Sequence, residues 1–147
     1  MADSKLPAWI QDHLSRYIAT NGDDGYWWDA TLGGGTGKVP TLLLTTIGRK
    51  SGHALTMPLI FGRHGDEYAV VASKGGAPAH PAWYLNLVAD PHVRVQVKGD
   101  VFAARARTAD AAERAALWPQ MVGIYAPFEQ YQQKTERQIP IVLLTRA

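Results

Sequence analysis

Two short segments of this sequence place cations beside glycines. The first, Gly48 to Gly52, reads Gly-Arg-Lys-Ser-Gly and stands between two apolar, β-rich runs. Arg49 can bind two oxygens of a phosphate, and Lys50 adds a point charge. Ser51 offers a hydroxyl, and successive amides in a glycine-flanked turn can cradle an anion. A solvated hairpin turn explains the same residues, and taken alone this segment favours the turn, because charged turns are common.

The second segment follows an apolar strand pattern that ends at Ser73 and Lys74. Gly75 and Gly76 come next, and a helix is expected to begin near Pro81. Glycines let backbone amides approach a ligand closely, and the N-terminus of a helix favours negative charge. An ordinary strand-to-helix connection is the alternative. Neither segment is a Walker loop or a dinucleotide fingerprint.

Other kinds of chemistry lack the residues they need. The chain has no cysteine, which excludes a disulfide framework, a thiolate metal site and a cysteine nucleophile. No G-x-S-x-G elbow is present. The histidines have no ligand spacing such as H-E-x-x-H, so we expect no metal site and expect most of them to be exposed. They are His13, His53, His64, His80 and His92.

The composition is typical of one globular domain spanning residues 1–147, with 46% hydrophobic and 19% charged residues. The net charge is only +2, and the cations are scattered except at Arg49–Lys50 and around Lys74. A nucleic-acid module clusters many more on one face, so we expect a small anionic ligand and no nucleic acid. No apolar run approaches the roughly 20 residues that span a bilayer. Because no signal-peptide pattern is present either, we expect a cytoplasmic protein.

The periodicity of the apolar residues predicts a mainly β, α+β fold. Tight turns join most of the strands, which makes them antiparallel, and about six such strands close or half-close into a barrel. Asn21 to Pro40 is expected to be an irregular loop pinned by aromatic residues. The expected strands are Thr41–Ile47, Ala54–Phe61, Glu67–Ser73, His92–Val97, Val101–Ala106 and Ile139–Thr145. The expected helices are Pro7–Ala19 with Ser4 as a cap, Ala82–Asp90, Ala109–Gly123 with Asp110 and Glu113 at capping-box spacing, and Pro127–Lys134.

Aromatic residues cluster in or near the expected helices. Core packing is favoured for Trp83 and Trp118. Tyr125 and Tyr131 flank the break at Ala126–Pro127, where their hydroxyls can face a pocket. Both the core and the pocket interpretations stay open for these two tyrosines.

Taken together, five motifs resemble the deazaflavin-dependent nitroreductases of actinobacteria. They are LLLTTIGRKSG, MPL, VVASKGGAPAHPAWYLNL, DPHVRVQV and IPIVLLTR, in this order within residues 39–146. The resemblance implies a split β-barrel with a cofactor groove over residues 39–147, preceded by an N-terminal helix and loop over residues 1–38. It also implies coenzyme F420, a deazaflavin with a flat apolar ring, a phosphodiester and an oligoglutamate tail.

The resemblance assigns cofactor contacts to residues of both glycine-containing segments. Arg49 and Lys50 are implied to hold phosphate or glutamate carboxylates, while Met57 and Pro58 lie against the ring. The helix that follows the second segment is implied to line the groove. The full implied set is Gly48, Arg49, Lys50, Ser51, Gly52, Met57, Pro58, Ala72, Ser73, Lys74, Gly75, Gly76, Trp83, Tyr84 and Asn86.

The reaction implied is hydride transfer from the reduced deazaflavin to a lipophilic, electron-poor acceptor such as a quinone, nitroaromatic or enone. Ser73, Tyr125 and Tyr131 match catalytic polar groups on the acceptor side. Relatives that reduce nitroimidazole drugs carry tyrosines where this chain has Ile60 and Phe128. The acceptor side is therefore expected to be more apolar, which favours quinones over that kind of nitroreduction.

Three alternatives stand beside this reading: an FMN enzyme on the same fold, an F420 carrier without efficient turnover, and a binder of nucleic acid or anionic surfaces. The N-terminal helix is expected to pack on the barrel. Two other possibilities remain for this helix with Trp9, Trp27 and Trp28. It could cover the substrate site, or it could make a peripheral contact with the inner face of the cell membrane. The sequence leaves the oligomeric state open.

Overall fold

The computed structural model describes residues 6–147 of the protein. Within these residues, antiparallel strands follow the order β1-β2-β3-β4-β7-β6-β5, and a further pairing of β2 with β5 closes the six strands β2 to β7 into a barrel. The predicted antiparallel barrel is therefore confirmed. The strands are β1 Trp27–Asp29, β2 Lys38–Ile47, β3 Ala54–His64, β4 Glu67–Val71, β5 His92–Val97, β6 Asp100–Thr108 and β7 Ile141–Arg146.

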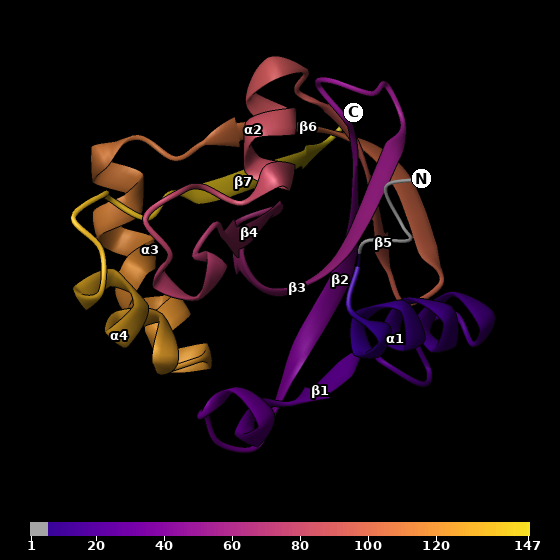
Figure 1. Cartoon of the computed structure of the whole chain (residues 1–147), viewed down its shortest axis with the longest axis horizontal. Helices are drawn as coiled ribbons and strands as arrows, with labels where there is room; N and C mark the ends of the chain where they lie inside the picture. The colour runs from indigo at the N-terminus through magenta and orange to yellow at the C-terminus, as the bar shows by residue number, and fades with distance from the viewer. Residues whose placement is uncertain (1–5) are drawn as a thin grey trace.

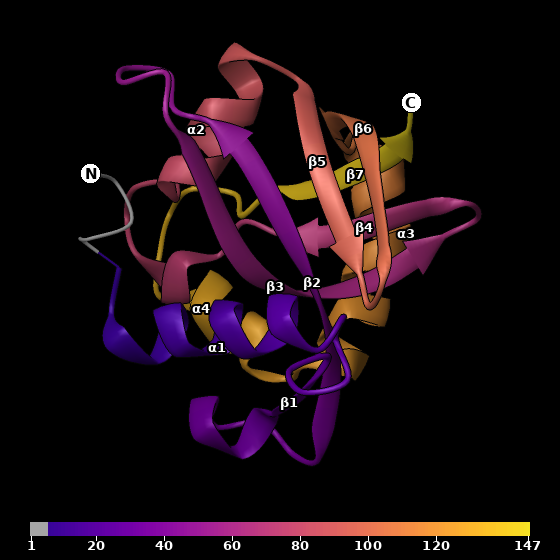
Figure 2. The same ribbon diagram turned by 90° about the vertical axis from the view of Figure 1, so that its right-hand side faces the viewer.

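Helices lie on opposite sides of the barrel (Figure 1). In this view α3 and α4 lie on one side of the barrel and α1 lies on the other. The perpendicular view places α1 and β1 near one end of the long strands β2 and β3, and α2 near their other end (Figure 2). The helices are α1 Ala8–Ala19, η2 Ala30–Gly33, η3 Lys74–Gly76, α2 Ala82–Ala89, α3 Ala111–Ile124 and α4 Pro127–Gln133, where η marks a 3₁₀ helix. None of the helices within residues 6–147 has the length and apolar character needed to cross a membrane.

Two apolar cores hold these elements together. The first fills the barrel with aliphatic side chains that include Leu42, Leu44, Val70, Val95 and Leu144. The second joins the barrel wall to α3 and α4 through Leu117, Met121, Phe128, Ile141 and Leu143. Each fully buried leucine or isoleucine contributes about 1.5–3 kcal/mol. A rigid barrel wall therefore supports the surface that carries the polar loops.

The N-terminal helix packs on the barrel, as predicted. Ile10, His13 and Tyr17 are buried, and the Tyr17 hydroxyl donates to the Thr41 carbonyl at 2.9 Å and accepts from the Lys98 amide at 2.9 Å. His13 is therefore an exception to the expectation of exposed histidines, and its Nε2 lies 2.7 Å from a backbone carbonyl. Ser4, the expected cap of this helix, lies outside the described residues.

The predicted loop between α1 and the barrel contains a strand that the sequence pattern did not reveal. In β1, Trp27 pairs with Pro40 and Asp29 pairs with Lys38, so β2 begins at Lys38 rather than at Thr41. A strand of three residues is too short to show an alternation of apolar and polar side chains.

The capping box between Asp110 and Glu113 is confirmed. The Glu113 amide donates to the Asp110 carboxylate at 2.9 Å, and the Asp110 amide donates to the Glu113 carboxylate at 3.0 Å.

Candidate active site

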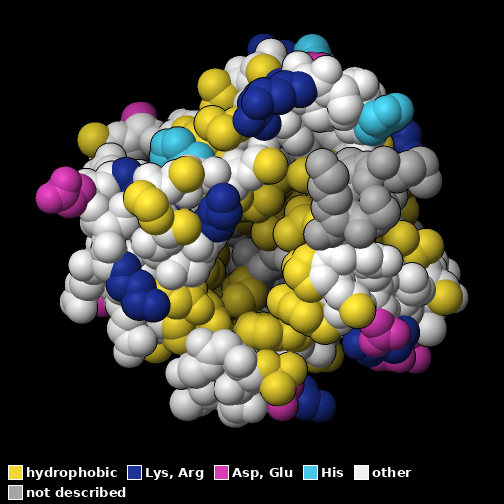
Figure 3. Space-filling view, in the orientation of Figure 1, with side chains coloured by type: hydrophobic (Ala, Val, Ile, Leu, Met, Phe, Trp, Pro, Cys, Tyr) yellow, Lys and Arg dark blue, Asp and Glu magenta, His cyan; other side chains and the backbone are white. Residues whose placement is uncertain are grey.

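A cavity of about 1090 Å³ opens on the surface beside β3. The space-filling view shows a hollow with hydrophobic walls, and Lys and Arg side chains at its rim (Figure 3). None of the described residues that line the cavity is an aspartate or glutamate, whereas Arg49, Lys50 and Lys74 all line it. The cavity therefore joins an apolar interior to a cationic edge.

The Gly48–Gly52 segment is a hairpin turn between β2 and β3, as its simplest interpretation predicted. The Gly48 amide donates to the His53 carbonyl, and the Gly52 amide donates to the Gly48 carbonyl, both at 2.8 Å. Gly52 has a φ of 75°, a conformation that glycine adopts without strain. The same turn places Arg49 and Lys50 at the cavity, so the two interpretations of this segment are compatible.

Asn86 of α2 fixes the backbone of this turn. Its Oδ1 accepts from the backbone amide of Arg49 at 3.2 Å and from the Arg49 guanidinium at 3.1 Å. Its Nδ2 donates to the Thr46 hydroxyl at 3.1 Å, and the residue is only 3% exposed. A buried amide held by three hydrogen bonds keeps a single orientation, and Asn86 therefore orients Arg49 at the cavity edge.

The loop after β4 forms the facing edge of the cavity. Lys74, Gly75 and Gly76 all have positive φ, at 47°, 63° and 82°. A Cβ added to Gly76 would lie 2.7 Å from the Tyr131 carbonyl oxygen, so this loop is packed closely against α4. Ser73 is 9% exposed and lines the cavity, and its hydroxyl makes no hydrogen bond with any other residue between 6 and 147. The hydroxyl is available to a ligand.

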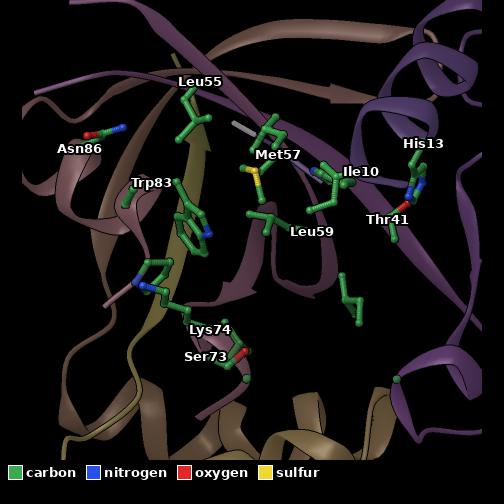
Figure 4. Close-up of a pocket in the computed structure, with 18 of the residues that line it drawn as sticks. Ile10, His13, Thr41, Leu55, Met57, Leu59, Ser73, Lys74, Trp83 and Asn86 are labelled. Carbon is green, nitrogen blue, oxygen red and sulfur yellow. The ribbon is translucent and has the colours of Figure 1, made fainter. Parts of the chain in front are cut away.

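Apolar side chains form the wall between these two edges. In β3, residues 55–60 are all half-buried, unlike the mostly buried β2 beside it, because the cavity runs along this strand. Met57 and Leu59 lie at the centre of the close-up, with Trp83 and Lys74 on one side and Ile10 on the other (Figure 4). Such a surface suits a flat aromatic ligand.

Two tyrosines close the part of the cavity formed by α4 and η2. The Tyr125 hydroxyl donates to the Gly33 carbonyl at 3.0 Å, so the Tyr131 hydroxyl, 3.2 Å away, donates to Tyr125. Burial, together with this contact, raises the pKa of Tyr125 well above its ordinary value. A Cβ at Gly33 would collide with the Tyr125 hydroxyl, which explains the glycine there. Phe128 and Ile60, where the sequence departs from nitroimidazole-reducing relatives, both line this apolar region.

The structure brings most of the predicted site residues to one cavity. Those that line it are Gly48, Arg49, Lys50, Ser51, Met57, Pro58, Ser73, Lys74, Gly75, Trp83, Asn86, Tyr125 and Tyr131. Four predicted residues do not line it, namely Gly52, Ala72, Gly76 and Tyr84. Tyr84 instead lies with its hydroxyl 2.8 Å from the Thr108 hydroxyl, outside the cavity. We therefore leave Tyr84 out of the proposed cofactor contacts.

The N-terminal segment supplies part of the cavity wall, which the sequence left open as an alternative to plain packing on the barrel. Trp9, Ile10, Trp28 and Leu32 line the cavity. The tryptophans of this segment were the available signal of a site there, because large apolar side chains are stabilised by packing on an apolar surface. Plain packing was the favoured expectation, because nothing in the sequence indicates which side of the barrel the segment covers.

A cluster of possible metal ligands lies outside this cavity. His64, Glu67 and Glu113 place ligand atoms within 4.8 Å of one another. Arg107 binds both carboxylates, at 2.7 Å from Glu113 and 3.0 Å from Glu67, and its hydrogen bonds lower the pKa of Glu113 to about 2. The guanidinium therefore already offsets part of the negative charge that would attract a cation, and the three charged side chains form an ion-pair network.

Comparison with known proteins assigns this chain to an enzyme family. Residues 9–146 match the family model described as F420H(2)-dependent quinone reductase. The chain is 38% identical over 137 residues to the F420H(2)-dependent quinone reductase Rv1261c of Mycobacterium tuberculosis, covering 91% of this chain and 87% of the relative.

Solved structures agree with this match. A structure described as an F420-H2 dependent reductase, FDR-A, has 42% identity and a TM-score of 0.66, covering 71% of this chain and 93% of its own. Another, described as a domain-swapped dimer, has 36% identity and a TM-score of 0.68, covering 92% of this chain and 96% of its own. The predicted family, enzyme class and cofactor are thus confirmed. The chain belongs to the F420H(2)-dependent quinone reductase family.

Proposed function

We propose that the cavity beside β3 is where this chain binds reduced F420 and a quinone for hydride transfer. The observation that carries the proposal is the combination of three cations at the two facing edges of the cavity with an apolar wall along β3 between them, and with no carboxylate among the described lining residues. F420 has the same division between a polyanionic tail and a flat apolar ring. The residues present therefore fit this cofactor.

The two loops would hold the anionic part of the cofactor. Arg49 and Lys50 approach from the β2–β3 turn, and Lys74 approaches from the loop after β4. Their positive charge attracts phosphate and carboxylate groups, and Arg49 can bind two oxygens at once. Met57, Pro58 and Trp83 supply the wall for the ring. Once bound, the reduced deazaflavin supplies the hydride that the acceptor takes up.

The chain's own contribution to the reaction is the Ser73 hydroxyl, a polar group beside a largely apolar wall. The Ser73 hydroxyl, free of partners among the described residues, can donate to an oxygen on which negative charge develops. Tyr125 and Tyr131 would line the acceptor side and orient the acceptor there. Ile60 and Phe128 make that side apolar, which suits a quinone ring.

A titration tests the proposal and separates its alternatives. We expect saturable binding of F420 that is tighter than binding of FMN, measured by calorimetry on the purified chain. Tighter binding of FMN would contradict the cofactor assignment. Binding of F420 with no menadione-dependent oxidation of the reduced cofactor would instead support the carrier alternative.

Tyr125→Phe is expected to lower the turnover number several-fold while changing the Kd for F420 by less than about twofold. The change removes the hydroxyl that joins Gly33 to Tyr131 on the acceptor side, so that side loses its order while the cations keep their positions. Steady-state kinetics with menadione and an F420 titration measure the two effects. Tyr84→Phe is the matched control, because its hydroxyl lies outside the cavity. A larger loss in F420 affinity than in turnover would place Tyr125 on the cofactor.

We further propose a peripheral membrane contact at the mouth of the cavity. Trp9 and Leu32 line the cavity and are 58% and 75% exposed, which is unusual for such large apolar side chains. A lipophilic quinone could then pass from the bilayer to the site. Co-sedimentation with lipid vesicles should fall in Trp9→Ser and stay unchanged in Ser15→Ala. Equal sedimentation of the two variants would contradict the contact.

A further inference from the structure

Arg137 ties together the loop after β4 without lining the cavity. Its Nε donates to the Ala77 carbonyl at 2.9 Å, and its Nη2 donates to the Ser73 carbonyl at 2.8 Å. Its Nη1 donates to the Ala72 carbonyl at 3.3 Å and lies 3.1 Å from Nδ1 of His80. One guanidinium therefore binds the start and the end of the loop at the same time.

His80 takes part in this arrangement as a neutral acceptor. A guanidinium only donates, so Nδ1 of His80 must carry its lone pair toward Arg137. Burial, with the adjacent charge of Arg137, lowers the pKa of His80 below its ordinary value, which keeps the ring neutral. The His80 ring also packs against the Tyr84 ring, with 4.8 Å between the two ring centroids. Tyr84 thus supports the loop from behind.

The loop needs such support because its backbone is strained. Lys74 has a φ of 47°, and non-glycine residues adopt this left-handed conformation only at a cost. The surroundings must supply the compensation, and the direction of the Lys74 side chain depends on this conformation. A loop that relaxes would move the cation away from the cavity edge.

The position of Arg137 is itself fixed. The Gln132 side chain donates to the Arg137 carbonyl at 2.8 Å, and the Arg137 amide donates to the Thr135 hydroxyl at 3.3 Å. Between residues 6 and 147, no carboxylate forms an ion pair with the guanidinium. Its N–H groups donate to backbone carbonyls of the loop, so Arg137 stabilises the loop and is not part of a surface ion pair.

We propose that Arg137 is a positioning residue for cofactor binding. It holds the loop after β4 so that Lys74 meets the anionic part of F420. This inference rests on the proposed function for its ligand, although the ordering of the loop can be measured without the ligand. Arg137 acts only through the loop, since it reaches no part of the cavity.

Hydrogen exchange tests the first half of this inference on the full chain without any ligand. In Arg137→Met, amides of residues 73–77 should exchange about tenfold faster, because the hydrogen bonds that close the loop are gone. Trypsin cleavage after Lys74 should accelerate as well. Arg105→Met, an exposed arginine on β6, is the control. If Arg137→Met does not fold, Arg137→Lys replaces it, since a single ammonium nitrogen cannot take the place of the three separate guanidinium nitrogens that bind the three carbonyls.

A double-mutant cycle tests the second half. Arg137→Met should raise the Kd for F420 about tenfold, and Lys74→Ala should then add little in that background. Lys50→Ala, on the other loop, should keep its full effect in both backgrounds. Unchanged exchange in residues 73–77, or additive effects of Arg137→Met and Lys74→Ala, would overturn the inference. If the wild-type chain binds no F420, the proposed function fails, and the exchange experiment alone decides whether Arg137 orders the loop.

Discussion

Lys50→Ala should raise the Kd for F420 about five- to tenfold at low salt, and the difference from the wild type should shrink toward about twofold near 0.5 M salt. Lys50 is exposed at the tip of the β2–β3 turn and lines the cavity edge. Its charge acts on phosphate or carboxylate oxygens through solvent, and ions screen such an attraction. Fluorescence titration of F420 at several salt concentrations measures the effect.

The control for this variant is Lys38→Ala. Lys38 is an exposed lysine on β2 that does not line the cavity, so removing it changes the net charge by the same amount. Its affinity for F420 should match the wild type. Equal losses in both variants would mean that the overall charge attracts the cofactor and that Lys50 makes no specific contact.

Ser73→Ala should lower the turnover number about ten- to a hundredfold while leaving the Kd for F420 within about twofold of the wild-type value. The Ser73 hydroxyl lines the cavity and bonds to no described residue, so its donor is available when charge develops on the acceptor. An interaction made mainly in the transition state changes turnover more than ground-state binding. Steady-state kinetics with reduced F420 and menadione measure both quantities.

Two further variants make the Ser73 result interpretable. Ser73→Thr keeps a hydroxyl and should recover part of the turnover. Ser15→Ala removes an exposed serine on α1 outside the cavity and should behave like the wild type. A variant Ser73→Ala with normal turnover but weaker F420 binding would place the residue in cofactor binding alone.

The barrel could be predicted because its signals are local. Alternation of Val93, Val95 and Val97 with polar residues marks a strand with one dry face, and tight turns force antiparallel neighbours. The strand β1 could not be predicted, because Trp27 to Asp29 is too short to show an alternation of apolar and polar residues. It is a strand only through its pairing with β2. Closure through the β2–β5 pairing likewise depends on contacts far apart in sequence.

The candidate site shows the same division. Arg49, Lys50 and Lys74 were predicted from their types and glycine neighbours, and the structure places all three at one cavity. Arg137 was not predicted, because its partners are backbone carbonyls 60 to 65 residues earlier in the chain, and backbone carbonyls leave no pattern in the sequence around it. The family resemblance implied that Tyr84 lines the groove, but its hydroxyl lies beside that of Thr108 and the residue does not line the cavity.

The acceptor-dependent oxidation of reduced F420 tests the central claim most directly. The purified chain is mixed anaerobically with reduced F420, menadione is added at increasing concentration, and formation of oxidised F420 is followed by its absorbance. We expect oxidation faster than in the protein-free mixture, with a rate that saturates in menadione and depends on Ser73. A rate equal to that of the protein-free mixture at every menadione concentration, with F420 bound, would contradict the proposal that this cavity transfers hydride to a quinone.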